Sequence, residues 1–204
     1  MQDPRTQLGA TVSRRGTASA KLTHGSLFTG VGGMDLGLDA AGFKTVWHVE
    51  QNPYCLKVLN KHWPNVPKFT DVTKCGRHNL EPVDIISGGY PCQDHSIAGK
   101  RRGLGTPESS TKRRGLWYHY LRIIDELRPA WVIIENVPRL IHTADIDIVL
   151  SGMEGIGYTC WPTVVGAENL GAPHERKRVW ILCHRNDAPS AGMPANSEES
   201  KGNI

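Results

Sequence analysis

The chain has 204 residues, of which 39% are hydrophobic, and a formal net charge of +4. This length favours one α/β domain with a real core and leaves too little sequence for two complete domains. The five cysteines form no Cys-x-x-Cys pair and the nine histidines are scattered, so we expect no metal site. With no secretory signal and no long apolar span, this cysteine usage indicates a reducing, cytoplasmic compartment and no membrane association.

Both ends of the chain are polar. Residues 1–23 are rich in Arg, Ser, Thr and Gly without apolar periodicity, and residues 186–204 are similarly polar. We therefore expect a flexible basic tail at the N-terminus, a single domain over residues 24–185, and a polar tail at the C-terminus.

Between the tails, apolar strand patterns alternate with amphipathic helix patterns. Strands are expected at 26–28, 45–49, 83–86 and 131–134, and helices at 34–41, 54–62 and 116–127. This alternation predicts an α/β fold with a mostly parallel, doubly wound sheet. After residue 146, a helix to about residue 153 is followed by strands at 158–165 and 179–182 with no helix between them. Such a connection predicts an antiparallel pair at the sheet edge.

A glycine-rich turn, Phe28-Thr29-Gly30-Val31-Gly32-Gly33, follows the first expected strand. Glycines at this place let the backbone approach a ligand closely. The pattern is not the dinucleotide Gly-x-Gly-x-x-Gly, and it fits a nucleoside-type cofactor without a pyrophosphate better than NAD. The alternative is a tight turn without a ligand.

Two acidic residues strengthen the cofactor interpretation. Glu50 ends the second strand twenty positions after Gly30, where a carboxylate would accept hydrogen bonds from ribose hydroxyls. Asp71 follows the short segment 68–70 and would face an adenine amino group. Together with the glycine turn, they predict a cofactor pocket.

Cys92 lies at the end of Gly88-Gly89-Tyr90-Pro91-Cys92, directly after an apolar strand. A cysteine at the mouth of a strand, next to glycines and a stiffening proline, is placed like a nucleophile. It must be a thiolate to act, and nearby cations would favour that form. The alternative is an inert packed cysteine.

Glu135 follows the very apolar strand 131–134. We expect its carboxyl to be partly desolvated, to hold its proton more tightly and to donate it to a ring nitrogen. The alternatives are a salt bridge or a helix start.

The segment 100–114 contains six lysines and arginines against one glutamate. A local basic cluster beside a candidate active site suggests a polyanionic substrate. A solvated surface loop is the alternative.

Taken in order, these motifs and Arg176-Lys177-Arg178 resemble the DNA cytosine-5 methyltransferase family, from about Ser26 to Leu182. The resemblance implies a Rossmann-like S-adenosylmethionine-dependent methyltransferase that flips its base and forms a covalent bond from Cys92 to C6 of cytosine. The catalytic residues it implies are Cys92, Glu135, Arg176 and Arg178. It assigns S-adenosylmethionine binding to Phe28, Gly30, Gly32, Gly33, Glu50, Asp71 and Pro91, and DNA binding to Ser96, Lys100, Arg101 and Arg102.

The sequence departs from the family pattern in three places. Asp94-His95-Ser96 stands where Pro-Phe-Ser is commoner, and His174 stands where the family usually has Gln. Family members also continue into a target-recognition domain and a segment that completes the cofactor site, neither of which is matched after His184. The partners we expect are therefore DNA and a second subunit carrying target recognition, in the cytoplasm of a bacterial or phage-type host. The alternatives are a catalytically silent or partner-dependent half of a split methyltransferase, and RNA cytosine-5 methylation.

Overall fold

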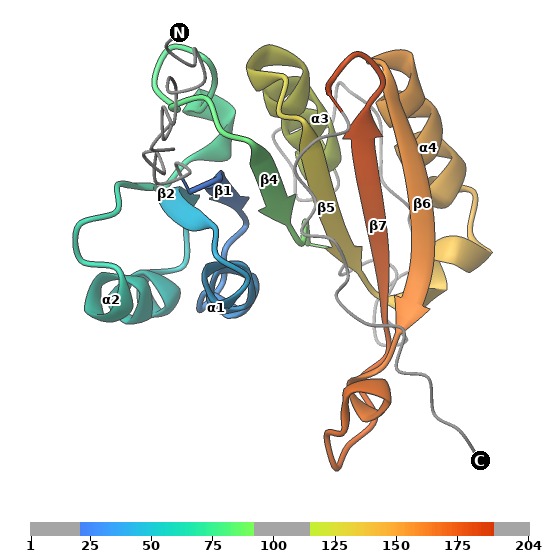
Figure 1. Cartoon of the computed structure of the whole chain (residues 1–204), viewed down its shortest axis with the longest axis horizontal. Coiled ribbons are helices and arrows are strands. Elements are labelled where there is room, and N and C mark those ends of the chain that lie inside the picture. The colour runs from blue at the N-terminus through green and yellow to red at the C-terminus, as the bar shows by residue number, and fades with distance from the viewer. Residues whose placement is uncertain (1–20, 92–114, 190–204) are drawn as a thin grey trace, which may run out of the picture.

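The computed structural model describes residues 21–91 and 115–189, which form one seven-stranded sheet flanked by helices (Figure 1). The strand order is β3-β2-β1-β4-β5-β7-β6. The strands are β1 Thr23–Leu27, β2 Lys44–Val49, β3 Lys68–Phe69, β4 Ile85–Gly88, β5 Trp131–Asn136, β6 Tyr158–Val165 and β7 Arg178–Arg185. The helices are α1 Gly33–Ala40, α2 Pro53–His62, α3 Leu116–Leu127 and α4 Asp145–Gly155, with short 3₁₀ segments η1 Val72–Lys74, η4 Pro138–His142 and η5 Ala167–Leu170.

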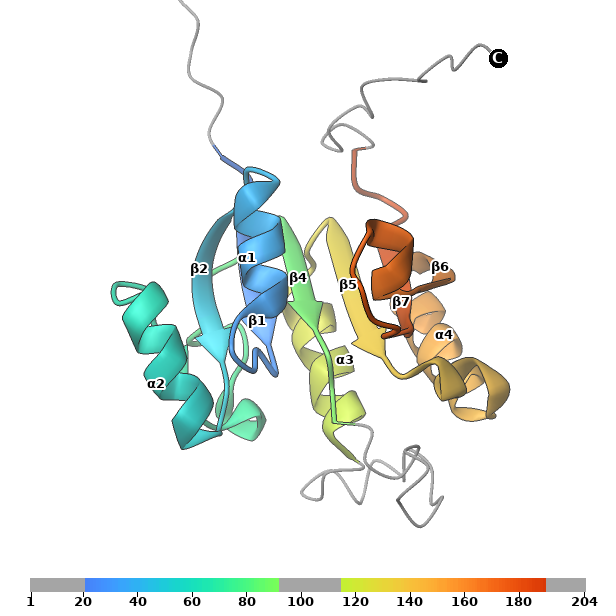
Figure 2. The same cartoon turned by 90° about the horizontal axis from the view of Figure 1, so that it is seen from below.

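The first five strands are parallel, so their carboxyl ends lie at one edge of the sheet. The chain builds outward from β1 in both directions, to β2 and β3 on one side and to β4 and β5 on the other. Helices α1 and α3 lie on opposite faces of the sheet, as Figure 2 shows. This confirms the doubly wound, mostly parallel sheet, with its topological switch point between β1 and β4.

The antiparallel pair is also confirmed. β7 runs antiparallel between β5 and β6, and β6 forms the sheet edge. The register places Cys160 opposite Cys183, where the two form a disulfide with their Cα atoms 4.2 Å apart. This bond was not predicted from the sequence, because only the hairpin register brings the two cysteines together.

Several element boundaries differ from the sequence prediction, most clearly those of β1, β4, β5 and β7. β1 begins at Thr23, because Asp84 accepts hydrogen bonds from both the backbone N–H and the hydroxyl of Thr23, at 2.7 and 2.8 Å. β4 begins at Ile85, two residues later than expected. β5 continues through Glu135 and Asn136 because both residues pair with β7.

The two faces of the β5–β7–β6 region differ in burial. On the α3 and α4 side, Val132, Ile134 and Ile181 are fully buried. On the other face, Ile133, Trp180 and Leu182 are half-buried, and Trp161 is 52% exposed. Among the described residues no helix covers this face, which we call the open face (Figure 1). None of the described helices is long and apolar enough to cross a membrane.

Candidate functional site

A cavity of about 440 Å³ lies at the carboxyl edge of the parallel strands. Its walls come from the residues that follow β1, β2, β3 and β4, together with the start of α3. The sequence-predicted cofactor residues among them are Phe28, Glu50, Asp71 and Pro91. The position, at the switch point of the sheet, is where doubly wound folds bind nucleotide-type ligands. We call it the nucleoside cavity.

The glycine turn between β1 and α1 has a constrained backbone. Phe28 adopts a left-handed conformation with φ 53°, which is rare for a residue with a side chain. Gly32 has φ 89°, and a Cβ added there would lie 2.6 Å from the ring of Trp63. Glycine at this position is therefore required both by the backbone conformation and by the neighbouring indole.

Glu50 ties the glycine turn to the start of α2. Its two carboxylate oxygens accept hydrogen bonds from the backbone N–H groups of Gly30 and Asn52, each at 2.7 Å. Each carboxylate oxygen has a further lone pair, so Glu50 remains able to accept a bond from a ligand hydroxyl. Its place in the cavity wall fits the predicted ribose contact.

Asp71 follows β3, the neighbour of β2, and caps the 3₁₀ segment η1 at the cavity wall. Its carboxylate accepts hydrogen bonds from the hydroxyl and the backbone N–H of Thr73, at 2.7 and 3.0 Å. These bonds lower the pKa of Asp71 below its ordinary value. Asp71 is thus an ionised acceptor at the cavity wall.

A second hollow, of about 610 Å³, lies between α1 and the carboxyl end of β5, bounded also by β7. Glu135, Arg176 and Arg178 line it, together with Gly30 and Gly33 of the glycine turn. We call it the carboxylate groove. Phe28 and Gly89 line both hollows, so the two meet at these residues.

Glu135 and Arg178 form an ion pair inside the carboxylate groove. Nε of Arg178 lies 2.8 Å from Oε1 of Glu135, and their side chains are 23% and 25% exposed, respectively. The other carboxylate oxygen lies over Gly89, where an added Cβ would approach it to 2.5 Å. The salt bridge, one of the two alternatives for Glu135, is therefore present. Whether Glu135 donates a proton to a ring remains a prediction.

Asn136 is a site residue to which the sequence analysis gave no role of its own. Its side chain is buried, donates to the carbonyl of Tyr90 at 3.4 Å and accepts from the N–H of Val137 at 2.8 Å. These bonds connect the end of β5 to the segment that leads into Cys92. The signal in the sequence was the polar residue directly after Glu135 in an otherwise apolar strand.

Cys92 and the predicted DNA-contacting residues Ser96, Lys100, Arg101 and Arg102 lie outside the described residues. Pro91, which precedes the cysteine, lines the nucleoside cavity. Arg176 is exposed at the mouth of the carboxylate groove. Within residues 21–91 and 115–189, no three His, Cys, Asp or Glu side chains gather as metal ligands.

Comparison with known proteins places this geometry in a family. The family model for C-5 cytosine-specific DNA methylases matches residues 22–203. The type II methyltransferase M.CviJI of Paramecium bursaria Chlorella virus IL3A is 37% identical over 163 residues, covering 79% of this chain and 42% of M.CviJI. M.AquIA of Picosynechococcus is 34% identical over 181 residues, covering 78% of this chain and 71% of M.AquIA.

A crystal structure of a prophage-encoded DNA modification methyltransferase from E. coli is similar in fold, with a TM-score of 0.64 and 26% identity. The match covers 80% of this chain and 47% of that protein. This chain thus spans less than half the length of both the E. coli protein and M.CviJI. Its sequence from β1 to β7, its sheet order and its motifs all agree with one family. The chain belongs to the C-5 cytosine-specific DNA methylases.

Proposed function

We propose that this chain transfers a methyl group from S-adenosylmethionine to C5 of cytosine in DNA. One observation carries the proposal: the nucleoside cavity and the carboxylate groove meet at Phe28 and Gly89. A cofactor in the first and a pyrimidine in the second would come together at this junction. Direct transfer between two ligands requires such a meeting point.

The nucleoside cavity fits S-adenosylmethionine in its donors and acceptors. Glu50 and Asp71 place two carboxylates in the cavity wall, suited to ribose hydroxyls and an adenine amino group. The glycine turn would hold the remainder of the molecule, because it lets the backbone approach closely. When bound, S-adenosylmethionine supplies the methyl group that is transferred.

Cys92 would act as the nucleophile. C5 of cytosine is a poor nucleophile, and addition of the Cys92 thiolate to C6 places electron density on C5. Glu135 would hydrogen-bond N3 and the exocyclic amine and stabilise the charge that moves onto the ring. Once C5 carries the methyl group, loss of the C5 proton restores the double bond and expels the thiolate.

The target cytosine must leave the double helix to reach the carboxylate groove. Base flipping costs a few kcal/mol, about the unstacking energy of one nucleotide. Arg176 and Arg178, at the groove, would support the flipped base. Ser96, Lys100, Arg101 and Arg102 would bind phosphates, since basic and hydroxyl side chains are the usual phosphate ligands.

A second candidate is that the chain is active only with a further polypeptide segment, such as a second subunit carrying target recognition. The open face favours it, because half-exposed Trp180 and Leu182 lie beside Trp161, which is 52% exposed. Contiguous apolar surface of this kind marks an interaction site.

In the proposed function, residues 24–185 form the catalytic domain between two tails. The type II methyltransferases among the relatives support a role in restriction–modification in a bacterial or phage-infected cell.

Two experiments test the proposal: trapping of a covalent complex with DNA, and measurement of methyl transfer. The full chain with S-adenosylmethionine should form a covalent complex with duplex DNA containing 5-fluorocytosine, because fluorine at C5 blocks the release step. Cys92→Ser should abolish this complex and leave cofactor affinity nearly unchanged. Tritiated methyl transfer is measured on DNA and on tRNA, with and without a candidate partner. Transfer to tRNA alone would contradict DNA as the substrate, and activity that appears only with the partner would establish the second candidate.

A further inference from the structure

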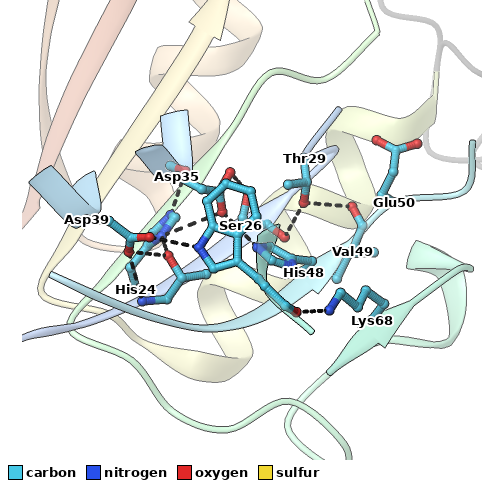
Figure 3. A network of polar contacts seen from close by, with 12 residues as sticks. His24, Ser26, Thr29, Asp35, Asp39, His48, Val49, Glu50 and Lys68 are labelled. Carbon is cyan, nitrogen blue, oxygen red and sulfur yellow. Dashed lines mark hydrogen bonds and ion pairs between the residues drawn. The ribbon is translucent and has the colours of Figure 1, made fainter. Parts of the chain in front are cut away.

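A cluster of buried polar side chains lies beneath the glycine turn (Figure 3). Its centre consists of His24 and Ser26 on β1, Asp35 on α1, and His48 on β2, all with 0% exposure. We call this set the Asp35 cluster. A carboxylate at this depth is costly unless its neighbours compensate, so the contacts that hold it identify what it does.

Asp35 is held from two strands. The hydroxyl of Ser26 donates to Oδ2 at 3.2 Å, and Nε2 of His48 lies 3.1 Å from Oδ1. The His48 contact has ion-pair distance, although the ring nitrogen is not aligned for a hydrogen bond. Asp35 therefore connects α1 to both β1 and β2.

His24 forms the floor of the cluster as a neutral ring. Burial lowers the pKa of His24 to about 4, with the nearby Asp35 opposing the shift. Its two nitrogens lie 3.0 Å from the hydroxyl of Thr45 and 2.8 Å from that of Ser87. Both ring nitrogens thus have hydroxyl partners on β2 and β4, and Nδ1 also lies 3.9 Å from Oδ1 of Asp35.

Asp35 is the only fully buried residue of α1. The helix is eight residues long, and its apolar Leu36 is 60% exposed. An ordinary amphipathic helix packs on a sheet through an apolar stripe. Here the inward side chain at the centre of the first turn is a carboxylate, so a polar contact fixes the position of the helix on the sheet.

One turn later in α1, a second carboxylate, that of Asp39, also binds residues outside the helix. Asp39 accepts from Nε1 of Trp63 at 2.8 Å and from the hydroxyl of Thr45 at 3.0 Å. The ring of Trp63 in turn lies against Gly32, the N-cap residue of α1. Trp63 thus connects Asp39, in the second turn of α1, to Gly32 in the glycine turn.

The glycine turn is held on one side by the strand ends and on the other by α1. On the strand side, the hydroxyl of Thr29 bonds the carbonyl of Ser26 at 3.2 Å, the N–H of Thr29 bonds the carbonyl of Val49 at 3.3 Å, and Gly30 bonds Glu50 at 2.7 Å. On the helix side, Gly32 is the N-cap of α1, and its carbonyl accepts from the N–H of Leu36 at 3.0 Å. The shape of the turn therefore depends in part on where α1 sits.

We propose that Asp35 is a positioning residue for the cofactor, holding α1 against the sheet so that the glycine turn keeps the shape that binds S-adenosylmethionine. Asp35 does not line the nucleoside cavity or the carboxylate groove. Its effect passes through the first turn of α1. The inference rests on the proposed cofactor site. It makes cofactor affinity depend on Asp35, a buried residue that does not touch the cofactor.

The test compares Asp35→Asn with a matched control in the full chain. The variant keeps the shape of the side chain and removes the charge. We expect the dissociation constant of S-adenosylmethionine, measured by calorimetry, to rise about tenfold. We also expect faster amide hydrogen exchange at Thr29–Leu36. The control, Tyr158→Phe, removes a buried hydroxyl that bonds the carbonyl of Pro129 at 2.6 Å on a distant strand. It should lower stability and leave both the dissociation constant and the exchange at Thr29–Leu36 unchanged.

Two further measurements keep the outcomes distinct. If Asp35→Asn does not fold, Ser26→Ala removes a single bond to the same carboxylate and should weaken cofactor binding about threefold in a folded chain. If the unmodified chain does not bind S-adenosylmethionine, the proposed function fails, while hydrogen exchange at the turn still tests the positioning role. Wild-type exchange at Thr29–Leu36 in folded Asp35→Asn and Ser26→Ala would overturn the inference.

Discussion

Glu135 and Arg178 face one another across neighbouring antiparallel strands, with Oε1 and Nε 2.8 Å apart. The pair stands on the β5 and β7 strands, which are rigid elements, and not on a loop. The carboxylate is therefore held in one orientation before any substrate arrives. Such preorganisation suits the role proposed for Glu135, which is to hydrogen-bond a flipped base.

Arg178→Met should lower kcat of the active protein about 10–100-fold, because the variant keeps the length of the side chain and loses the bond that orients Glu135. Arg178→Lys should recover part of the loss, since lysine keeps the charge and lacks the guanidinium geometry. Lys177→Met, at the exposed neighbouring position, is the matched control and should behave like the unmodified chain. Equal kcat values for the two Met variants would show that Arg178 does not contribute to catalysis.

Gly89→Ala should reduce methyl transfer about tenfold or more through the same carboxylate. The new Cβ would lie 2.5 Å from Oε2 of Glu135, so the carboxylate must move. Because the end of a flexible side chain gives way, the melting temperature should change little. Gly155→Ala is the control, since a Cβ at Gly155 has nothing within 4 Å. A fully active Gly89→Ala would mean that the position of Glu135 is not critical.

The sequence predicted the parallel sheet well, because each of its elements carries a local signal. Apolar runs separated by amphipathic helices are visible without any partner strand, and α3 and β6 were predicted with the bounds that the structure has. The prediction of an element's boundary was wrong where pairing with a distant strand determines it. β5 extends through Glu135 and Asn136 only because β7 pairs with both, and β7 lies more than forty residues later.

In the candidate site, too, some features could be predicted from local sequence and others depend on the fold. Motif residues such as Phe28, Glu50 and Glu135 could be named from their places after strands. The pairing of Glu135 with Arg178 and the Asp35 cluster could not, since they depend on strand register and on how α1 packs. An isolated acidic residue in a helix pattern normally indicates a solvated surface, and only the fold reveals that Asp35 is fully buried.

Glu50→Ala should raise the dissociation constant of S-adenosylmethionine, corresponding to a loss of about 1–3 kcal/mol. The change removes the proposed ribose contact and also frees the N–H groups of Gly30 and Asn52. Glu50→Gln keeps an acceptor oxygen and should lose less. Glu81→Ala, an exposed acid away from the cavity, controls for the change in charge. An unchanged dissociation constant in Glu50→Ala would show that the cofactor binds elsewhere.

The buried His24 predicts a stability that decreases in mild acid. Burial lowers its pKa to about 4 in the folded chain, against an ordinary 6.5. The neighbouring charged groups are Asp35 and Asp39, which raise the pKa, and His48, which lowers it. Between these two pH values the unfolded chain binds a proton that the folded chain does not. The free energy of unfolding therefore keeps this contribution above pH 6.5 and loses it as the pH falls toward 4, by about 3 kcal/mol in total.

Urea unfolding between pH 7 and pH 4.5 measures this contribution when the unmodified chain is compared with His24→Gln. Glutamine keeps hydrogen-bonding groups near Thr45 and Ser87 but does not titrate, so the variant should be less stable at pH 7 and lose less stability on acidification. His142→Gln replaces an exposed histidine and should follow the unmodified chain at every pH. The difference between the two variants isolates the buried ring from the carboxylates that titrate in the same range. If His24→Gln loses stability as steeply as the unmodified chain, the acid sensitivity arises outside the Asp35 cluster.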